Sequence, residues 1–266
     1  GRYVTAATKV HADDTPVPVL DPGRGKTKTG RLWVYVRDDR PAGSTEPPAA
    51  WYRYSPNRKG CHPQDHLKHY RGILQADAYG GYAKIYATGR IDEAACWAHA
   101  RRPFWDLYEN QGRVAGSVAD QALQRIAALY AIEAQIRGQP PDVRRRQRQA
   151  RAGPLLEELR GWLTGMVGRV SAKSELAKAI GYSLTRWRAL TRYRDDGRIE
   201  IDNNAAERAL RGVALGRGNY LFMGSDAGGQ RAASIYSLVE TAKLNGLDPQ
   251  AYLREVLTRI AEHPIN

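Results

Sequence analysis

The stretch RLWVYVRD (31–38) predicts a β-strand, because apolar residues alternate along it with a period of two. One face would carry Leu32, Val34 and Val36, and the other Trp33, Tyr35 and Arg37. Outward from it, YVTAATKVHAD (3–13), AAWYRYSP (49–56) and GILQAD (72–77) have a similar character, and turn-rich segments separate them. The first third of the chain therefore predicts a strand meander followed by one further strand, with a strand running from Tyr3 to the acids at 13 and 14.

From about residue 103 the pattern becomes helical. ADQALQRIAALYAIEAQIRG (119–138) has apolar residues near helical spacing, and SAKSELAKAIGYSLTRWRALTRY (171–193) continues this pattern. After residue 201 come further helices and a glycine-rich loop. The order predicts an α/β (α+β) fold with a mainly helical insertion. The expected segments are 1–102 and 196–266 for the core and 103–195 for the insertion.

Composition narrows the classes of protein that fit. The chain has 266 residues, of which 42% are hydrophobic, and its formal net charge is +13. Such a charge predicts a polyanionic partner, first of all nucleic acid, although a basic protein without one is the alternative. No apolar run is long enough for a membrane span, so no membrane partner is expected. With only Cys61 and Cys96, the chain fits a reducing cytoplasm.

Acidic residues stand at the ends of the expected elements. Asp13 and Asp14 close one expected strand, Asp77 closes another, and Glu207 lies in IDNNAAERALR (201–211), which looks like a helix start. Three such carboxylates in one cleft could hold two divalent ions, which suits phosphodiester chemistry. The alternative is local. The aspartates could cap the turns that follow them, and Glu207 could complete a capping box with Asn204.

The context of these acids resembles a known family. HADDTPVPVLDPGRGKTKTGRLWVYVRDDRP, LQADAYGGY, AACWAHARRPFWDL, KSELAKAIGYSLTRW, IDNNAAERALR and GRGNYLFMGSDAGGQRAASIYSLVETAKLNGLDPQAYL closely resemble transposases of the insertion sequence 66 family. The resemblance extends from about Lys9 to the last residue. It implies a DDE-type transposase catalytic core with a ribonuclease H-like fold.

The resemblance assigns the acids one by one. Asp13 in ADDTP would be the first catalytic and metal-binding acid, Asp77 in ADAYGGY the second, and Glu207 in NNAAER the third, holding Mg²⁺ with Mn²⁺ as a substitute. Family members usually have Glu where this chain has Asp14, which leaves open whether Asp13 or Asp14 faces the metals. From Asp77 to Glu207 the chain runs 130 residues (207 − 77), which agrees with a helical insertion between them.

The segment CWAH (96–99) has three interpretations. Cys96 and His99 could belong to a zinc site, together with ligands from the cluster Cys61, His62, His66 and His69. They could instead be a buried cysteine and a polar histidine. The resemblance implies a third role, in which His99 is catalytic and contacts the scissile phosphate, and this role ranks first.

Arginines flank the candidate acids. Arg101, Arg102, Arg208 and Arg211 are expected to bind DNA phosphates beside the carboxylates. A basic run in the insertion, Arg144, Arg145, Arg146, Arg148 and Arg151, is either a solvated helix face or a further contact with the DNA backbone. Trp187 is expected to be a core residue, with stacking on an unpaired base as the alternative.

The resulting expectation is a DNA transposase that first hydrolyses a phosphodiester and then joins the freed 3′ hydroxyl to target DNA. Its partners would be transposon ends and target DNA, further copies of the chain on that DNA, and accessory proteins of the same element. It would act in the bacterial cytoplasm, at the nucleoid. Two alternatives remain, namely a truncated, inactive relic that only binds DNA and a nuclease of ribonuclease H type.

Overall fold

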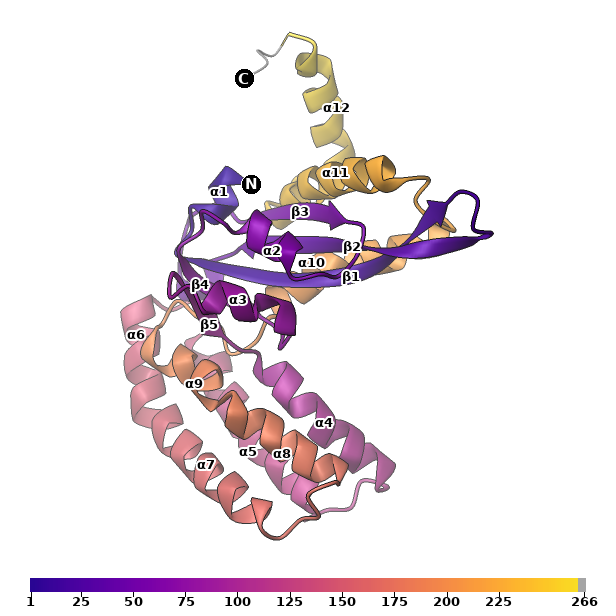
Figure 1. The fold of residues 1–266 in the computed structure, drawn as a ribbon. Coiled ribbons are helices and arrows are strands. Elements are labelled where there is room, and N and C mark those ends of the chain that lie inside the picture. The colour runs from indigo at the N-terminus through magenta and orange to yellow at the C-terminus, as the bar shows by residue number, and fades with distance from the viewer. Residues whose placement is uncertain (263–266) are drawn as a thin grey trace.

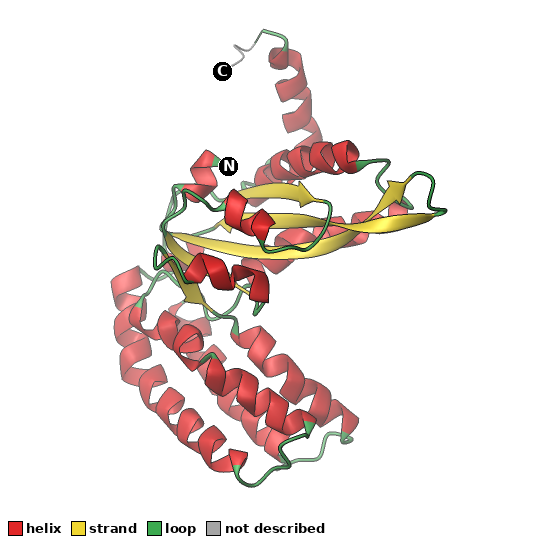
Figure 2. Cartoon of the chain, viewed as in Figure 1, coloured by secondary structure: helices red, strands yellow, loops and turns green. Residues whose placement is uncertain are grey.

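The computed structural model describes residues 1–262, and its centre is a five-stranded sheet in the order β3-β2-β1-β4-β5 (Figure 2). The first three strands form an antiparallel meander, β4 runs parallel to β1, and β5 runs parallel to β4. The strands are β1 (Lys9–Asp21), β2 (Lys26–Arg37), β3 (Ala49–Ser55), β4 (Gly72–Ala76) and β5 (Ile91–Ala94). Helices accompany the sheet, so the predicted mixed α/β class is confirmed.

The chain enters the sheet later than its sequence suggested. A strand from Tyr3 was predicted, but a short helix, α1 (Arg2–Thr5), occupies this position. This helix buries Val4, which is 2% exposed, on the face of the sheet that carries Trp33 and Tyr35. Burial of this side chain thus overrides the β propensity of the segment.

The first strand also continues beyond the point at which it was expected to end. Asp13 and Asp14 were predicted at a strand end, yet β1 extends to Asp21. Its parallel pairing with β4 does stop at Ala12, opposite Ala76, whereas its pairing with β2 continues. Beyond Ala12 one edge of β1 is therefore free of β4, and such an edge tolerates the two prolines of ADDTPVP.

The two faces of β2 are buried against different sets of residues, as its alternation predicted. Trp33 and Tyr35 pack with α1, with β4 and with the short helices after β3 and β4. Leu32, Val34 and Val36 pack on the opposite face against α10 (Asn204–Gly216) and α11 (Asp226–Leu244). The short elements on the first face are α2 (Cys61–His66), η2 (Gly80–Tyr82) and α3 (Ala83–Tyr86), and a turn, η1 (Arg40–Ala42), follows β2.

A block of helices follows β5 and lies beneath the β4–β5 end of the sheet in Figure 1. It has its own apolar core, which α4, α5, α7, α8 and α9 share. Trp187 is partly buried and packs against this core, with its ring centroid 5.8 Å from that of Trp97, which agrees with the predicted packing role. The elements are α4 (Trp97–Asn110), α5 (Val118–Ile136), α6 (Pro141–Gln147), a π-helical turn η3 (Arg148–Ala152), α7 (Gly153–Val167), α8 (Glu175–Thr185) and α9 (Trp187–Asp195).

The basic run of this block is not a uniform surface. Arg144 and Arg148 are 1% and 0% exposed, so neither proposed role, solvated face or DNA contact, fits them. Arg148 binds both carboxylate oxygens of Glu133 at 2.7 Å, and Arg144 binds Glu200 at 2.8 Å. Charges at this depth require a partner, and these pairs join α5 to η3 and to the chain that leaves the block. The exposed members of the run are Arg145, Arg146 and Arg151.

The chain then returns to the sheet. α10 packs against β1 and β2, and α11 crosses β3 (Figure 1). The crossing requires Gly229, because a Cβ atom there would meet the ring of Tyr54 at 2.4 Å. A turn, η4 (Arg217–Asn219), links α10 to α11, and α12 (Pro249–Ile260) follows and projects from the body in Figure 1. The last four residues of the expected 196–266 segment lie outside the described residues.

Within residues 1–262, no helix combines the length and the apolar character that a membrane span requires.

Candidate active site

The three candidate acids come from three elements that meet at one end of the β1–β4 pair. Asp13 lies on β1 and Asp77 follows β4, each one residue beyond the paired residues Ala12 and Ala76. Parallel strands therefore bring the two aspartates to the same level of the sheet. Asp13 lies opposite Val34 in the ladder, and Val34 packs with α10, the helix that carries Glu207.

The electrostatics of Asp13 agree with this proximity. Burial first, and then the charges of Asp77, Asp14 and Glu207, raise the pKa of its carboxyl group from the usual 3.8 to about 7. The backbone N–H of Asp14 donates to Asp13 Oδ1 at 2.7 Å and opposes this rise. A buried carboxyl group surrounded by other acids is best satisfied when a cation joins them.

Asp14 has a different environment, because successive residues of a strand point to opposite faces. Its side chain is 1% exposed and accepts hydrogen bonds from Arg31 Nη1 at 3.1 Å and from Arg58 Nη2 at 2.8 Å. Two guanidinium groups already neutralise it, whereas Asp13 forms no ion pair with the described residues. This contrast favours Asp13 over Asp14 as the acid that faces a metal.

Asp77 combines a local and a shared role. Its Oδ1 accepts the backbone N–H of Tyr79 at 3.1 Å, which is the turn-capping contact considered as the alternative for this acid. Its Oδ2 lies 3.6 Å from Arg58 Nη2 and lines an open groove. The turn contact uses one oxygen only, so capping does not exclude a ligand role.

Glu207 is not part of a capping box. Asn203, not Asn204, precedes α10, and Glu207 is the fourth residue of the helix, one position beyond the capping-box glutamate. Glu207 Oε1 is buried without a hydrogen-bond partner in residues 1–262, and so is His99 Nδ1. These two atoms lie 3.8 Å apart. Orphaned polar atoms of this kind indicate a missing ion, solvent molecule or substrate group.

One buried side chain connects the elements that carry the acids. Asn203 is 0% exposed, its Nδ2 donates to Ala12 O at 2.9 Å, and its Oδ1 lies 3.1 Å from His11 Nδ1. Its backbone N–H donates to Cys96 Sγ at 3.2 Å. Asn203 therefore fixes the start of α10 to β1 beside Asp13 and to the residue before α4.

The Cys96 group is the closest approach to a metal cluster within residues 1–262. Donor atoms of Cys96, His99 and Glu207 lie within 4.8 Å of one another. Burial raises the pKa of the Cys96 thiol to about 12, although backbone N–H groups of His99 and Asn203 donate to it. Structural zinc takes four ligands, so this three-donor group does not by itself make a structural zinc site.

The second set of zinc candidates is dispersed. His66 Nδ1 lies 3.0 Å from the hydroxyl of Tyr35, and burial lowers the pKa of His66 to about 3. Cys61 is exposed. His62 Nε2 lies 2.9 Å from Asn57 Oδ1, on the turn before α2. These residues therefore serve separate local contacts.

An open groove of about 820 Å³ runs from Asp77 along α4 and α8, and Asp77 is the one candidate acid in its lining. Its polar lining comes from both parts of the molecule, and includes Arg58, Asp77, Tyr79, His99, Arg102 and Tyr182. Of the four predicted phosphate-binding arginines, Arg102 lines this groove. Arg101 lies over the Trp105 ring, with 4.9 Å between its guanidinium carbon and the ring centroid.

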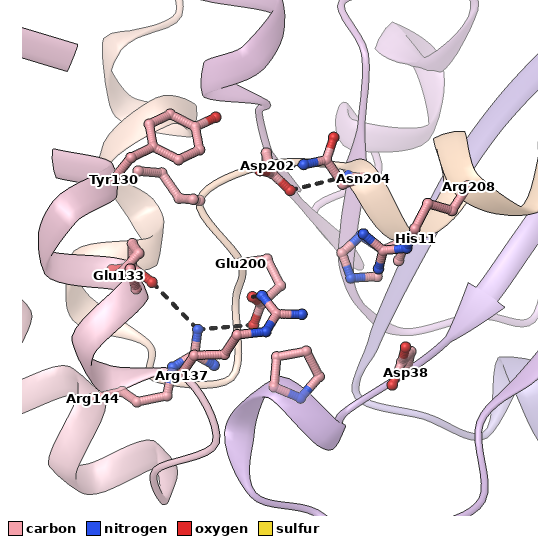
Figure 3. A pocket seen from close by; sticks show the side chains of 14 residues that line it. His11, Asp38, Tyr130, Glu133, Arg137, Arg144, Glu200, Asp202, Asn204 and Arg208 are labelled. Atoms are coloured by element: carbon pink, nitrogen blue, oxygen red, sulfur yellow. Dashed lines mark hydrogen bonds and ion pairs between the residues drawn. The ribbon is translucent and has the colours of Figure 1, made fainter. Parts of the chain in front are cut away.

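A second cavity, of about 240 Å³, lies behind Asn203. Figure 3 shows Arg208 in its lining, together with His11, Glu200 and Asp202, and none of the three candidate acids lines it. Arg208 therefore points away from the groove, and Arg211 is exposed farther along α10. Burial lowers the pKa of His11 to about 3 and keeps its ring neutral.

Sequence reasoning missed Arg58 and the linking role of Asn203. Arg58 lies in SPNRKG, a turn whose pattern carries no chemical signal. The linking role of Asn203 has no local signal, because its partners on β1 are about 190 residues away in sequence.

The residues fit a divalent cation. The charges of Asp77 and Glu207 both act on Asp13, whose pKa is raised to about 7, and Glu207 Oε1 has no hydrogen-bond partner in residues 1–262. Oxygen donors of this kind suit Mg²⁺ and Mn²⁺. Asp13, Asp77 and Glu207 are the side chains that would hold it.

Carboxylates beside an open groove, in a chain of net charge +13, are typical of proteins that act on nucleic acid. Comparison with protein families identifies the particular family. Residues 1–231 match the family described as "Transposase IS66 family", and residues 237–266 match the "IS66 C-terminal element". The chain belongs to the IS66 transposase family, which confirms the resemblance predicted from its motifs.

Similar proteins occur in Sinorhizobium fredii. The chain is 44% identical to the uncharacterized protein y4hP, over 99% of this chain and 50% of that protein. It is 40% identical to the uncharacterized protein y4qI, over 97% of this chain and 49% of that protein. The chain thus spans about half the length of these relatives.

Proposed function

We propose that this chain is the catalytic core of a DNA transposase of DDE type, with a ribonuclease H-like arrangement of strands. The observation that carries the proposal is the placement of Asp13 and Asp77 one residue beyond the last β1–β4 pair, with the charges of Asp77 and Glu207 both raising the pKa of Asp13. The mixed order of the sheet, with an antiparallel meander and two further parallel strands, supports the fold assignment.

In this proposal Asp13, Asp77 and Glu207 hold Mg²⁺. When bound, the metal supplies Lewis acidity at the phosphate and lowers the pKa of the attacking water. Water attacks the phosphorus of a phosphodiester, and the P–O3′ bond breaks to leave a 3′ hydroxyl and a 5′ phosphate. That hydroxyl then attacks a phosphorus of target DNA and displaces the 3′ oxygen there.

The chain's own residues prepare this chemistry. Asn203 connects the start of α10 to β1, and this contact fixes the position of Asp13 relative to Glu207. His99 lines the groove with its ring beside Glu207, and it would donate a proton or a hydrogen bond to a phosphate oxygen. Arg102 would bind phosphates farther along the groove. DNA ends, target DNA, further copies of the chain and accessory proteins are the proposed partners, at the bacterial nucleoid.

The test uses the 266-residue chain with Mg²⁺, a supercoiled plasmid and a short duplex that presents a free 3′ hydroxyl. Nicking of the plasmid and joining of the duplex to it are expected for the wild type and not for Asp13→Asn. Asp21→Asn, at the far end of β1, is the matched control. DNA binding without nicking would identify a relic, and cleavage restricted to RNA–DNA hybrids would identify a ribonuclease H-type nuclease.

A further inference from the structure

Arg58 occupies a position beside the candidate acids that the proposed function does not yet use. It lies in the turn between β3 and α2, and its side chain reaches the mouth of the groove lined by Asp77 and His99. Its guanidinium carbon lies 4.1 Å from the centroid of the Tyr79 ring. Its guanidinium group lies beside two carboxylates, those of Asp14 and Asp77, and this position requires an explanation.

The guanidinium group is held in one orientation. Arg58 Nε and Nη2 both bind Asp14, at 2.9 and 2.8 Å from its Oδ1. The Tyr79 hydroxyl donates to the backbone carbonyl of Arg58, and the Tyr79 ring lies against the guanidinium plane. Stacking and a two-point hydrogen bond fix both the tilt and the rotation of a planar group.

The fixed orientation leaves part of the group available. No hydrogen bond joins Arg58 Nη1 to any side chain or carbonyl in residues 1–262, and the side chain is 37% exposed. Nη2 lies 3.6 Å from Asp77 Oδ2, so the charge lies within ion-pair distance of the second acid. A preorganised guanidinium group with free N–H donors, next to the proposed reaction centre, matches a phosphate oxygen.

We propose that Arg58 is a phosphate-binding residue of the active site, and that Asp14 is a positioning residue that aims it. This inference rests on the proposed function, because it places the DNA strand across Asp77 at the mouth of the groove. Arg58 binds a non-bridging oxygen of the phosphate at or beside the cleaved bond. Asp14 thereby has a role that is not metal binding, which explains why two adjacent aspartates of β1 have different partners.

Arg31 provides a matched control. It also pairs with Asp14 and carries the same charge, but it lies on β2 outside the groove lining. Arg58→Gln and Arg31→Gln therefore remove the same charge and one partner of the same carboxylate. Only the first removes a charge that faces the groove.

The experiment measures the affinity of these variants for a fluorescent 25-base-pair duplex over a range of salt concentrations. Ca²⁺ is present, because it is a hard cation that takes carboxylate ligands. We expect Arg58→Gln to weaken binding about tenfold and to reduce the slope of log K against log salt by about 0.9, as for one lost phosphate contact. Arg31→Gln should keep the wild-type slope. Equal slopes for the two variants overturn the proposal.

Two further variants keep the test decisive if Arg58→Gln does not fold, which a thermal melt reveals. Arg58→Lys retains the positive charge but loses the planar set of guanidinium N–H donors. The slope of log K against log salt should therefore stay the same while the affinity for DNA falls. Asp14→Asn removes a negative charge, which by charge alone strengthens DNA binding, yet it should weaken binding because Arg58 loses its support. Stronger binding by Asp14→Asn would refute the positioning role.

These readouts do not require cleavage. A chain that binds DNA as expected but does not cut it therefore contradicts the proposed function and not the role of Arg58.

Discussion

Asp13 and Asp14 are neighbours on one strand, yet they differ in every property that matters for catalysis. Asp14 is neutralised by Arg31 and Arg58, whereas Asp13 lies among other acids with a raised pKa. The alternation of a β-strand is the cause, because it sends the two side chains to opposite faces. Two adjacent aspartates of one strand can thus supply one carboxylate that is suited to a metal ion and another that orients an arginine side chain.

The raised pKa of Asp13 predicts how stability depends on pH in the metal-free protein. The pKa moves from 3.8 to about 7 on folding, so the folded state holds the proton more tightly than the unfolded state. The free energy of unfolding should therefore fall as pH rises from about 4 to about 7, by at most about 4 kcal/mol. Asp13→Asn should remove this fall and be the more stable protein at pH 8.

Urea denaturation at several pH values, with EDTA present, measures this effect. Asp21→Asn is the control, because Asp21 lies at the end of β1 away from the other acids. A wild-type protein that gains stability between pH 4 and 7 relative to Asp13→Asn would contradict the assigned environment.

A bound divalent cation should offset the loss of stability that the ionised Asp13 carboxylate causes. If the acids bind Mg²⁺ or Mn²⁺ only when the protein is folded, Tm should rise with metal concentration. The free energy of unfolding should increase by about 3 kcal/mol when the metal concentration is a hundred times Kd. Calorimetric scans with added Mn²⁺ test this for the wild type and Asp13→Asn. The same rise in both proteins would show that the metal binds elsewhere.

At the scale of elements, Asn203 is the connection on which the site depends. Its side chain joins the loop before α10 to β1, and its backbone reaches Cys96. Asn203→Ala should lower the free energy of unfolding by about 1–3 kcal/mol, because Ala12 O and His11 lose a buried partner. Plasmid nicking should fall along with it.

Asn204→Ala is the control for this prediction. The Asn204 side chain binds Asp202 alone, at 2.7 Å, and does not reach the sheet. We expect a smaller loss of stability and intact nicking. An equal effect of the two substitutions on nicking would mean that the helix start, and not its link to β1, positions Glu207.

The helical block provides a second prediction at this scale. Glu133→Gln removes the partner of Arg148, which is 0% exposed, and should lower the free energy of unfolding by about 3–5 kcal/mol. Glu158→Gln breaks the pair with Arg125 at the surface of the block and should change it by less than about 1 kcal/mol. Urea denaturation compares them, and a small effect of Glu133→Gln would contradict the buried network.

These elements also show what the sequence could and could not predict. Periodicity predicted the meander, the strand after it and the helical block, and the motif resemblance identified the family, but β5 was not predicted. Local patterns did not reveal that β1 continues past Asp14, since this depends on its pairing with β2, which extends to Asp21. They also did not reveal that Arg144 and Arg148 are buried, because their partners Glu133 and Glu200 come from other parts of the chain.

At the scale of the whole molecule, charge should govern DNA binding. With a net charge of +13, affinity for a duplex should fall steeply with salt. Arg102 lines the groove beside Asp77, whereas Arg208 lines the separate cavity near Glu200. Arg102→Gln should therefore reduce the salt slope by about 0.9, and Arg208→Gln should leave it unchanged. Equal reductions would show that DNA also crosses α10.

The long excursion between the second and third acids also matters while the protein is being made. The ribosome adds about 5–20 residues per second, so Glu207 is synthesised about 7–26 s after Asp77. During that interval β1 and β4 can pair, but α10 and Asn203 are not yet present to complete the site. Under the proposed function, a nascent or prematurely terminated chain carries the two aspartates of the proposed metal site without its glutamate, and is not yet able to cut DNA.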